Sequence, residues 1–206
     1  MSTHTHDHHA PPPDQDGALG YYQVMEIALR ELLIERDVFT ADEVREAVEK
    51  MDARSPAQGA QVVARAWQDP EFKERLLADG SAACAELGFD IAPVRLVVVE
   101  NTEDVHNVIV CTLCSCYPRM LLGLPPDWYK ARAYRSRVVR EPRAVLTEFG
   151  TVLPAGTDIR VHDSTADMRY LVLPRRPDGT DGLNQDQLAA LVTRDCMVGV
   201  SLPKSP

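Results

Sequence analysis

The chain has 206 residues, of which 45% are apolar and 26% are charged, and its formal net charge is −9. This is ordinary globular composition, so wholesale disorder and collagen-like or coiled-coil arrays are excluded, and the length predicts one domain or one domain with an arm. No run approaches the ~18 consecutive apolar residues that a membrane span needs. The acidic balance argues against a general nucleic-acid binder.

The first 17 residues are rich in histidine, proline and acidic side chains and have little to bury. We expect a disordered tail over residues 1–17. Its histidines are interpreted as solvated, because a flexible tail has no second shell to fix imidazoles on a metal: His4, His6, His8 and His9. No apolar segment typical of a secretory signal is present at this end, so we expect a reducing, cytoplasmic location.

A helical pattern runs over residues 18–90. Apolar residues recur at spacings of three and four from Leu19 to Leu33, which predicts one apolar stripe on a first, longer helix. Further helix starts are indicated by capping residues, two of them followed by proline: Thr40-Ala-Asp-Glu43, Ser55-Pro56 and Asp69-Pro70. Gly88 fits the left-handed end of a last short helix. We expect a helical N-terminal arm whose first helix packs on its own core or on another subunit.

Near Pro93 the pattern changes from helical to extended. Segments rich in β-branched residues predict strands over residues 95–100, 105–111, 157–162 and 168–174, with a last edge strand over 198–202. Capping and proline signals predict helices that start at Asp127, at Glu141-Pro142 and at Asn184, the last of them running to about Arg194. Helices precede strands, so the fold class is α+β rather than a parallel doubly wound sheet. We expect the helical arm to be followed by a layered α-β-β-α domain over residues 91–206.

Three of the five cysteines fall within six residues, in the segment Val110-Cys111-Thr-Leu-Cys114-Ser-Cys116. Structural zinc sites normally use two separated cysteine pairs, iron–sulfur clusters need a fourth cysteine, and a third thiol would interfere with dithiol redox chemistry. The remaining interpretation is a claw in which the three sulfurs and the Ser115 and Cys116 amide nitrogens are the ligands. This donor set suits a trivalent, low-spin ion and leaves a sixth position open. The alternative is three structural cysteines at the end of a buried strand.

The cluster and the motifs after it resemble the α subunit of nitrile hydratase. The resemblance is carried by Val110–Cys116, by Gly-Leu-Pro-Pro-Asp-Trp-Tyr-Lys at 123–130 and by Tyr-Arg-Ser-Arg-Val-Val-Arg-Glu-Pro-Arg at 134–143, and it extends upstream through residues 100–110. It implies a metal held by the sulfurs of Cys111, Cys114 and Cys116 and by the amides of Ser115 and Cys116.

The resemblance also implies that Cys114 is oxidised to a sulfinate and Cys116 to a sulfenate, the first of which is mostly irreversible. Thr112 stands where the iron type carries serine, which indicates one Co(III) per chain rather than Fe(III). The implied reaction is hydration of a nitrile to its amide, with the Cys116 sulfenate or a water that it activates as the nucleophile. One or two β-type subunits would complete the active complex.

The chain departs from the family pattern at Arg119, where many members carry a tryptophan that lines the substrate pocket. An arginine removes an aromatic wall and adds a cation near the metal. That resembles the γ subunit of thiocyanate hydrolase, which has the same claw and an anionic substrate. It also fits nitrile hydratases for large polar nitriles of the toyocamycin type. A third reading pairs Arg119 with a partner-subunit carboxylate.

A basic segment surrounds this position. Residues 117–143 carry seven basic against two acidic side chains, a net of +5 that leaves −14 for the rest of the chain. We interpret the arginines as bonding carbonyls, carboxylates and oxidised sulfurs around the claw, against the alternatives of a nucleic-acid site or a solvated basic face. Cys84 and Cys196 are expected to be buried and without function. A non-catalytic cobalt carrier remains an alternative for the whole chain.

Overall fold

The computed structural model describes residues 20–206. The predicted tail over residues 1–17, with its histidines, lies outside the described residues. The described chain divides into two compact units, one ending at Val48 and the other spanning Glu49–Pro206. Among the described residues, no helix has the length and hydropathy that crossing a membrane requires.

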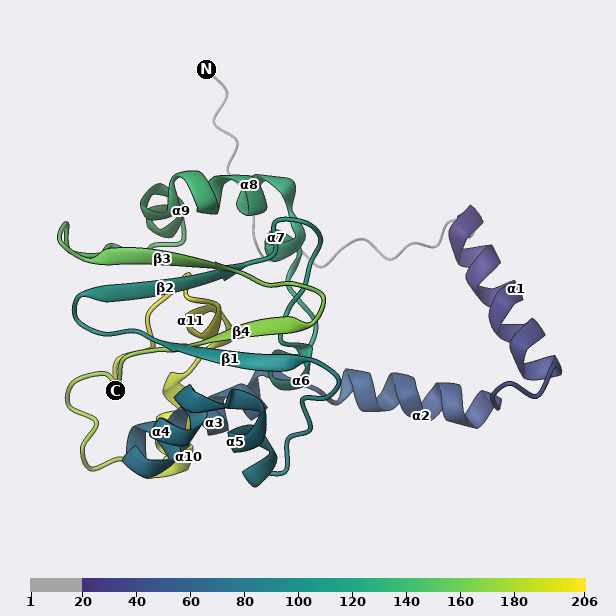
Figure 1. Ribbon diagram of the computed structural model, residues 1–206, viewed down its shortest axis with the longest axis horizontal. Helices are drawn as coiled ribbons and strands as arrows, with labels where there is room; N and C mark the ends of the chain where they lie inside the picture. Colours follow the sequence, from purple (N-terminus) through teal and green to yellow (C-terminus); the bar gives the residue numbers. More distant parts are fainter. Residues whose placement is uncertain (1–19) are drawn as a thin grey trace, which may run out of the picture. The chain divides into compact units, whose positions relative to one another are not determined.

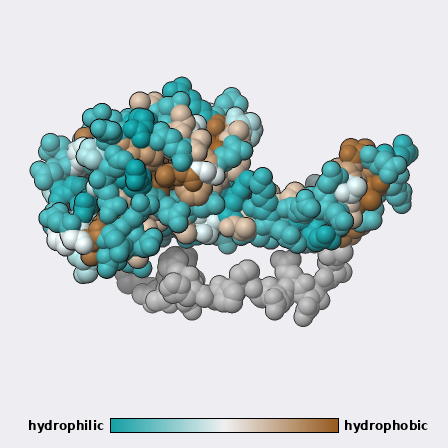
Figure 2. Space-filling view, turned by 90° about the horizontal axis from the view of Figure 1, so that it is seen from below, coloured by the Kyte–Doolittle hydropathy of each residue, from teal (hydrophilic) through white to brown (hydrophobic). Residues whose placement is uncertain are grey.

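Helices α1 (Tyr21–Glu35) and α2 (Ala41–Asp52) form the N-terminal region. The predicted capping box at the start of α2 is confirmed, because the Glu43 amide donates to the Thr40 hydroxyl and the Glu43 carboxylate accepts from the Thr40 amide. No residue of α1 is buried. Large hydrophobic side chains lie on its surface instead (Figure 2): Tyr21, Tyr22, Val24, Met25, Leu29 and Leu32.

Three short helices follow: α3 (Pro56–Gln68), α4 (Pro70–Ala78) and α5 (Gly80–Glu86). The predicted caps are confirmed, since the Ser55 hydroxyl accepts from the Ala57 amide and the Asp69 carboxylate accepts from the Phe72 amide. Gly88 has φ +80°, as the left-handed helix end requires. Helix α3 contributes buried alanines and valines to the core, and α4 and α5 pack on the first strand.

Two two-stranded parallel ladders form the centre of the larger unit (Figure 1). Strand β1 (Arg95–Glu100) pairs with β4 (Met168–Leu173), and β2 (Val105–Val110) pairs with β3 (Asp158–Asp163). The strands lie in the order β3, β2, β4, β1, with α3–α5 beside β1 (Figure 1). Both pairs are parallel, a feature that the order of helices before strands did not indicate.

The remaining helices cover the ladders. They are α6 (Arg119–Leu122), α7 (Asp127–Lys130), α8 (Arg132–Arg140), α9 (Pro142–Glu148), α10 (Gln185–Leu191) and α11 (Arg194–Val198). Helix α9 packs on β3, α10 packs on α3, and α11 packs on β2 and β4. The larger unit is therefore a mixed helix-and-sheet fold with a buried core on both sides of the strands, in agreement with the expected class.

Three local expectations are wrong. The edge strand over 198–202 is absent, because a capping box at Thr193 starts α11 and Gly199, at φ +92°, ends it. A Cβ at Gly199 would lie 2.0 Å from the Asn107 carbonyl oxygen, so the chain passes β2 too closely for any other residue. The helix from Gln185 ends at Leu191, before Arg194. Asp127 is the first residue of α7 rather than its cap, and its carboxylate pairs with Lys130 instead.

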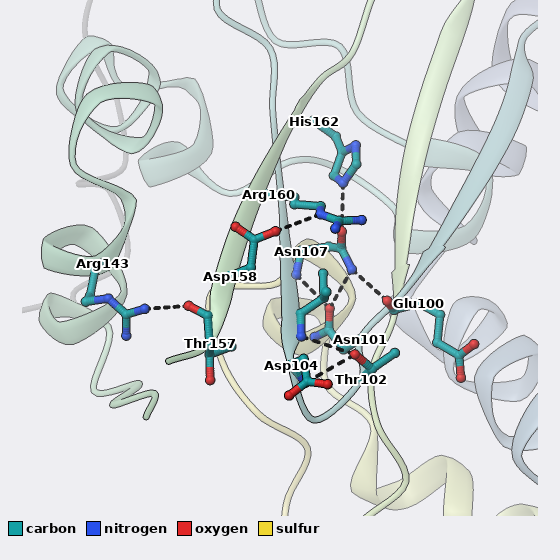
Figure 3. A network of polar contacts seen from close by, with 11 residues as sticks. Glu100, Asn101, Thr102, Asp104, Asn107, Arg143, Thr157, Asp158, Arg160 and His162 are labelled. Atoms are coloured by element: carbon teal, nitrogen blue, oxygen red, sulfur yellow. Dashed lines mark hydrogen bonds and ion pairs between the residues drawn. The ribbon is translucent and has the colours of Figure 1, made fainter. Parts of the chain in front are cut away.

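A buried polar network holds the turn between β1 and β2 (Figure 3). The Asn107 amide group donates to the Glu100 carbonyl and to the Asn101 side-chain oxygen, at 2.7 and 3.0 Å. Its own oxygen accepts from His162 Nε2 at 2.8 Å. His106 bridges Asn101, 3.2 Å from Nδ1, and the Gly199 carbonyl, 2.7 Å from Nε2. Because these buried groups have partners, the network fixes the start of β2.

Candidate metal centre

The cysteine cluster follows directly from the carboxyl end of β2. Cys111 is buried, Cys114 is exposed and Cys116 is half-buried, so the segment runs from the core to the surface and back. The Sγ atoms of Cys111 and Cys114 lie 3.4 Å apart, and those of Cys114 and Cys116 lie 3.3 Å apart. All three sulfurs lie within 4.8 Å of one another. The fold thus brings the three predicted sulfur ligands to one point.

The backbone of the cluster turns its amides toward the same point. The Cys114 amide donates to Cys111 Sγ at 3.3 Å. Hydrogen bonds from the Cys116 and Cys111 side chains lower the pKa of Cys114 to about 7, and hydrogen bonds from the Cys116 and Ser115 amides act in the same direction. Burial and the neighbouring Cys114 raise the pKa of Cys116 to about 12, against the opposing charge of Arg169. Sulfurs and amide nitrogens therefore face one another.

Two charged side chains hold the cluster from outside. The Asp163 carboxylate, at the end of β3, accepts from the Thr112 amide at 2.9 Å and from the Thr112 hydroxyl at 2.5 Å. The Arg135 guanidinium, on α8, donates to the Cys114 carbonyl at 2.9 Å and to the Thr112 carbonyl at 3.4 Å. A carboxylate thus binds donors of this loop and a guanidinium binds its acceptors.

Aromatic residues form the floor beneath the cluster. The Tyr129 hydroxyl donates to the Cys116 carbonyl at 2.8 Å, and the Tyr134 hydroxyl donates to the Ile109 carbonyl, two residues before Cys111, at 2.7 Å. Their rings pack with Tyr117, Trp128 and Phe149 in edge-to-face or tilted contacts. The aromatic residues of the two motifs at 123–130 and 134–143 therefore support the cluster from below.

The donor set fits a metal that prefers sulfur and nitrogen. Cys111, Cys114 and Cys116 offer one sulfur each, and the Ser115 and Cys116 amides are turned toward the Cys114 sulfur. The one metal-ligand cluster found in residues 20–206 is this one, without a nearby carboxylate or imidazole ligand. Hard cations such as Mg²⁺ or Ca²⁺ require oxygen ligands, so the residues fit a softer transition metal.

Arg119 lies apart from the ligand atoms. It is exposed at the start of α6 and lines a small hollow together with Tyr117, Met120 and Arg169. Arg169, which lines the same hollow, acts by its charge against the raised pKa of the Cys116 thiol. Arg119 and Arg169 thus place two cations in one hollow.

The other basic residues of segment 117–143 mostly bind the protein itself. Arg137 pairs with the carboxylates of Glu141 and Glu148, and Arg143 donates to the carbonyls of Leu153, Pro154 and Thr157. Arg135 bonds the cluster. Arg132, Arg135 and Arg140 also border a hollow of about 360 Å³ that reaches Thr112. The expectation that arginines bond carbonyls around the cluster therefore holds for Arg135, whereas Arg137 and Arg143 bind carboxylates and carbonyls elsewhere in the unit.

Sequence reasoning missed Asp163, Tyr129 and Tyr134 as supports of the cluster. Asp163 is far away in the sequence and is brought to Thr112 only by the parallel register that pairs it with Val110. The remaining cysteines are buried and free, and burial raises the pKa of Cys84 to about 12 and also raises that of Cys196. Neither Cys84 nor Cys196 belongs to the cluster.

Comparisons with known proteins agree with this site. The family model described as nitrile hydratase, alpha chain, matches residues 20–201. A nitrile hydratase subunit alpha from a Rhodococcus species is 54% identical over 182 residues, covering 87% of this chain and 92% of the relative. A cobalt-containing nitrile hydratase subunit alpha from Pseudonocardia thermophila is 51% identical over 181 residues, covering 86% and 89%. A thiocyanate hydrolase subunit gamma from Thiobacillus thioparus is 44% identical over 195 residues, covering 89% and 80%.

Two solved structures have a fold similar to that of this chain. A recombinant thiocyanate hydrolase with partially modified cobalt centres superposes with a TM-score of 0.86 at 43% identity, covering 91% of this chain and 92% of the other. A double mutant of the Fe-type nitrile hydratase from Comamonas testosteroni Ni1 gives 0.82 at 46% identity, covering 89% and 92%. The chain therefore belongs to the nitrile hydratase alpha-chain family.

Proposed function

We propose that this chain is the metal-carrying subunit of a nitrile hydratase that holds one Co(III) ion and converts a nitrile to its amide. The observation that carries the proposal is the convergence of three sulfurs within 4.8 Å, with the Ser115 and Cys116 amides turned toward them. The 51% identity to a cobalt-containing relative supports cobalt over iron, and Thr112 in the loop agrees with it.

Within this proposal each residue has a defined task. Cys111, Cys114, Ser115 and Cys116 hold the ion, which when bound supplies the Lewis acidity that polarises a carbon–nitrogen triple bond. Cys116, oxidised to a sulfenate, provides the oxygen that attacks the nitrile carbon or activates the water that does. Tyr129 fixes the Cys116 carbonyl at 2.8 Å and thereby limits the movement of its sulfur. Cys114 is carried as a sulfinate.

The exposure of the cluster supports a partner. Leu113, at the tip of the loop, is 90% exposed, and Cys114 is exposed beside it. An oxidised cysteine centre that must exclude bulk water needs a cover, and β-type subunits, one or two chains, would provide it. The exposed hydrophobic side chains of α1 agree with burial in such a complex. We infer a cytoplasmic complex, since the centre starts from reduced thiols.

The test is turnover by the cobalt-loaded complex of this chain with its β-type partner. We expect conversion of a neutral nitrile to the amide, and mass spectrometry of the peptide that contains residues 111–116 should show two added oxygens on Cys114 and one on Cys116. Active complex with an unmodified peptide would rule out the oxidised centre. A chain that exchanges cobalt readily and shows no turnover in any complex would instead be a cobalt carrier, because Co(III) in a catalytic centre is inert to exchange.

A second candidate is thiocyanate hydrolase, with thiocyanate as the substrate. It is favoured by the hollow that Arg119 shares with Arg169, because two cations there suit an anion. The thiocyanate hydrolase subunit gamma from Thiobacillus thioparus is 44% identical to this chain. Replacing Arg119 with Trp should shift preference toward small neutral nitriles, measured as the ratio of kcat/KM for a neutral nitrile to that for thiocyanate. An unchanged ratio would remove Arg119 from the substrate pocket.

A further inference from the structure

Arg135 is held by the cluster rather than by an acidic partner. Its Nη1 donates to the carbonyl oxygens of Cys114 at 2.9 Å and Thr112 at 3.4 Å. No other hydrogen bond or ion pair of this side chain exists among residues 20–206, and its buried Nε has no acceptor there. This half-buried guanidinium donates to two carbonyls of one loop, so we interpret its role as holding that loop in place.

The peptide geometry turns this contact into a constraint on Ser115. A peptide bond is planar and almost always trans, so the Cys114 carbonyl and the Ser115 N–H point in opposite directions. The carbonyl points outward onto Arg135. The Ser115 N–H therefore points to the side away from Arg135, and it is one of the groups that lower the pKa of Cys114. A single guanidinium contact on the outside thus sets the direction of a nitrogen on the inside.

The rest of the loop leaves this peptide without another anchor. Asp163 holds the Thr112 amide and hydroxyl, and Tyr129 holds the Cys116 carbonyl. Between these two points, Arg135 is the protein group that binds the Cys114 carbonyl among the described residues. Without it that carbonyl would be free to rotate toward water, and the Ser115 nitrogen would leave the sulfurs. A hydrogen bond from a charged donor opposes this rotation more strongly than a neutral one.

We propose that Arg135 is a positioning residue of the metal centre, which fixes the Cys114–Ser115 peptide so that the Ser115 nitrogen faces the ion. The inference rests on the proposed function, because it takes Ser115 as a ligand. It adds a residue on α8, outside the cysteine motif, whose loss affects the coordination of the ion before it affects the fold. Outer partners of metal ligands typically change metal affinity by about 10- to 100-fold.

The experiment compares Arg135→Ala, Arg135→Lys and Arg140→Ala in the complex loaded with cobalt. Arg140 lies on the same helix, borders the same hollow and makes no hydrogen bond to the loop, so its replacement is the matched control. The readouts are cobalt per chain after exposure to a chelator, the visible absorption from sulfur to cobalt, and thermal unfolding of the metal-free chain. None of them depends on turnover.

We expect Arg135→Ala to release cobalt about 10-fold faster or more and to show a shifted absorption, with an unchanged unfolding temperature. Arg135→Lys, which can still donate to one carbonyl, should recover part of the retention, and Arg140→Ala should match the wild type. Wild-type cobalt retention and absorption in Arg135→Ala would overturn the inference and leave the proposed function standing. If Arg135→Ala does not fold, Arg135→Met decides, because methionine keeps the length of the side chain but cannot donate a hydrogen bond: wild-type retention and absorption in that variant would overturn the inference. A wild-type chain that takes up no cobalt would overturn both.

Discussion

The two ends of β2 are built in opposite ways. At its start, Asn101, His106 and Asn107 are buried side chains that satisfy one another and the backbone. At its end, the loop after Val110 is held by Asp163 and Arg135 from the outside, while its sulfurs and two of its amides face one another. The first end uses its polar groups to bind the protein. The second end leaves its three sulfurs facing one another, as the proposed metal centre requires.

We infer that the start of β2 contributes mainly to the stability of the fold and that the loop after its end contributes mainly to the chemistry of the site. Buried hydrogen-bonded groups are costly to lose, because a partner left unpaired in the core keeps its desolvation penalty. An exposed loop contributes less to the free energy of unfolding, since water replaces its lost contacts. We therefore expect changes at the start of β2 to lower stability and changes at its end to remove function.

Replacement of Cys116 with Ser is expected to have the largest effect. The hydroxyl keeps the size of the side chain but cannot form a sulfenate, so turnover of the complex should fall by at least about 10³-fold, on the scale of losing a nucleophile from an interdependent site. The unfolding free energy of the metal-free chain should stay within about 0.5 kcal/mol of the wild type. Full activity in steady-state assays of this variant would eliminate the sulfenate mechanism.

Replacement of Asn107 with Ala tests the other end. The change leaves the His162 ring, the Glu100 carbonyl and one Asn101 contact without their partner, so the unfolding free energy in urea should fall by about 3 kcal/mol. The control is Arg160→Ala in the adjacent strand β3, where an exposed ion pair to Asp158 contributes about 0.5 kcal/mol or less. Equal losses in the two variants would contradict the role of the buried network.

The pH dependence of the unfolding free energy is a further test of the difference between the two ends of β2, and its expected effect is the smallest. Burial lowers the pKa of His106 and of His162 from the usual 6.5. Below that value the unfolded chain binds protons that the folded chain does not, so the unfolding free energy should fall as the pH drops below 6.5 and level off once both states are protonated. His106→Gln should flatten this profile in urea titrations of the metal-free chain. An equally steep decline in that variant would assign the pH dependence to other groups.

Local chemistry made much of the fold predictable from sequence. Thr40, Ser55 and Asp69 cap helices as their side chains and neighbouring prolines require, and the β-branched runs at residues 95–100 and 105–110 form strands. The parallel pairing was not accessible, because it depends on β3 and β4 returning from more than fifty residues away. The edge strand is absent because Val198, its expected first residue, is the last residue of α11, and the left-handed Gly199 ends that helix.

The ligands of the centre were predictable for a different reason than its support. Three cysteines in six residues need only one tight turn to bring their sulfurs together, so their spacing indicated the site without any knowledge of the tertiary fold. Asp163 and Arg135 reach the loop only through tertiary packing, 51 residues away for the first and 21 for the second. No local pattern marks Asp163, and Arg135 was predicted only as one of several arginines in the basic segment.

The compactness of the cluster has a consequence for assembly. Because the sulfurs come from one hexapeptide that directly follows a buried strand, an ion that binds them closes only short loops and recruits no distant segment. The entropy lost on closure grows with loop length, so little chain entropy opposes loading. Sites that join distant segments couple metal binding to folding, and their metal-free chains unfold. Here the ligands come from one short segment, so we expect the rest of the fold to form without the ion and metal loading to be a separate step.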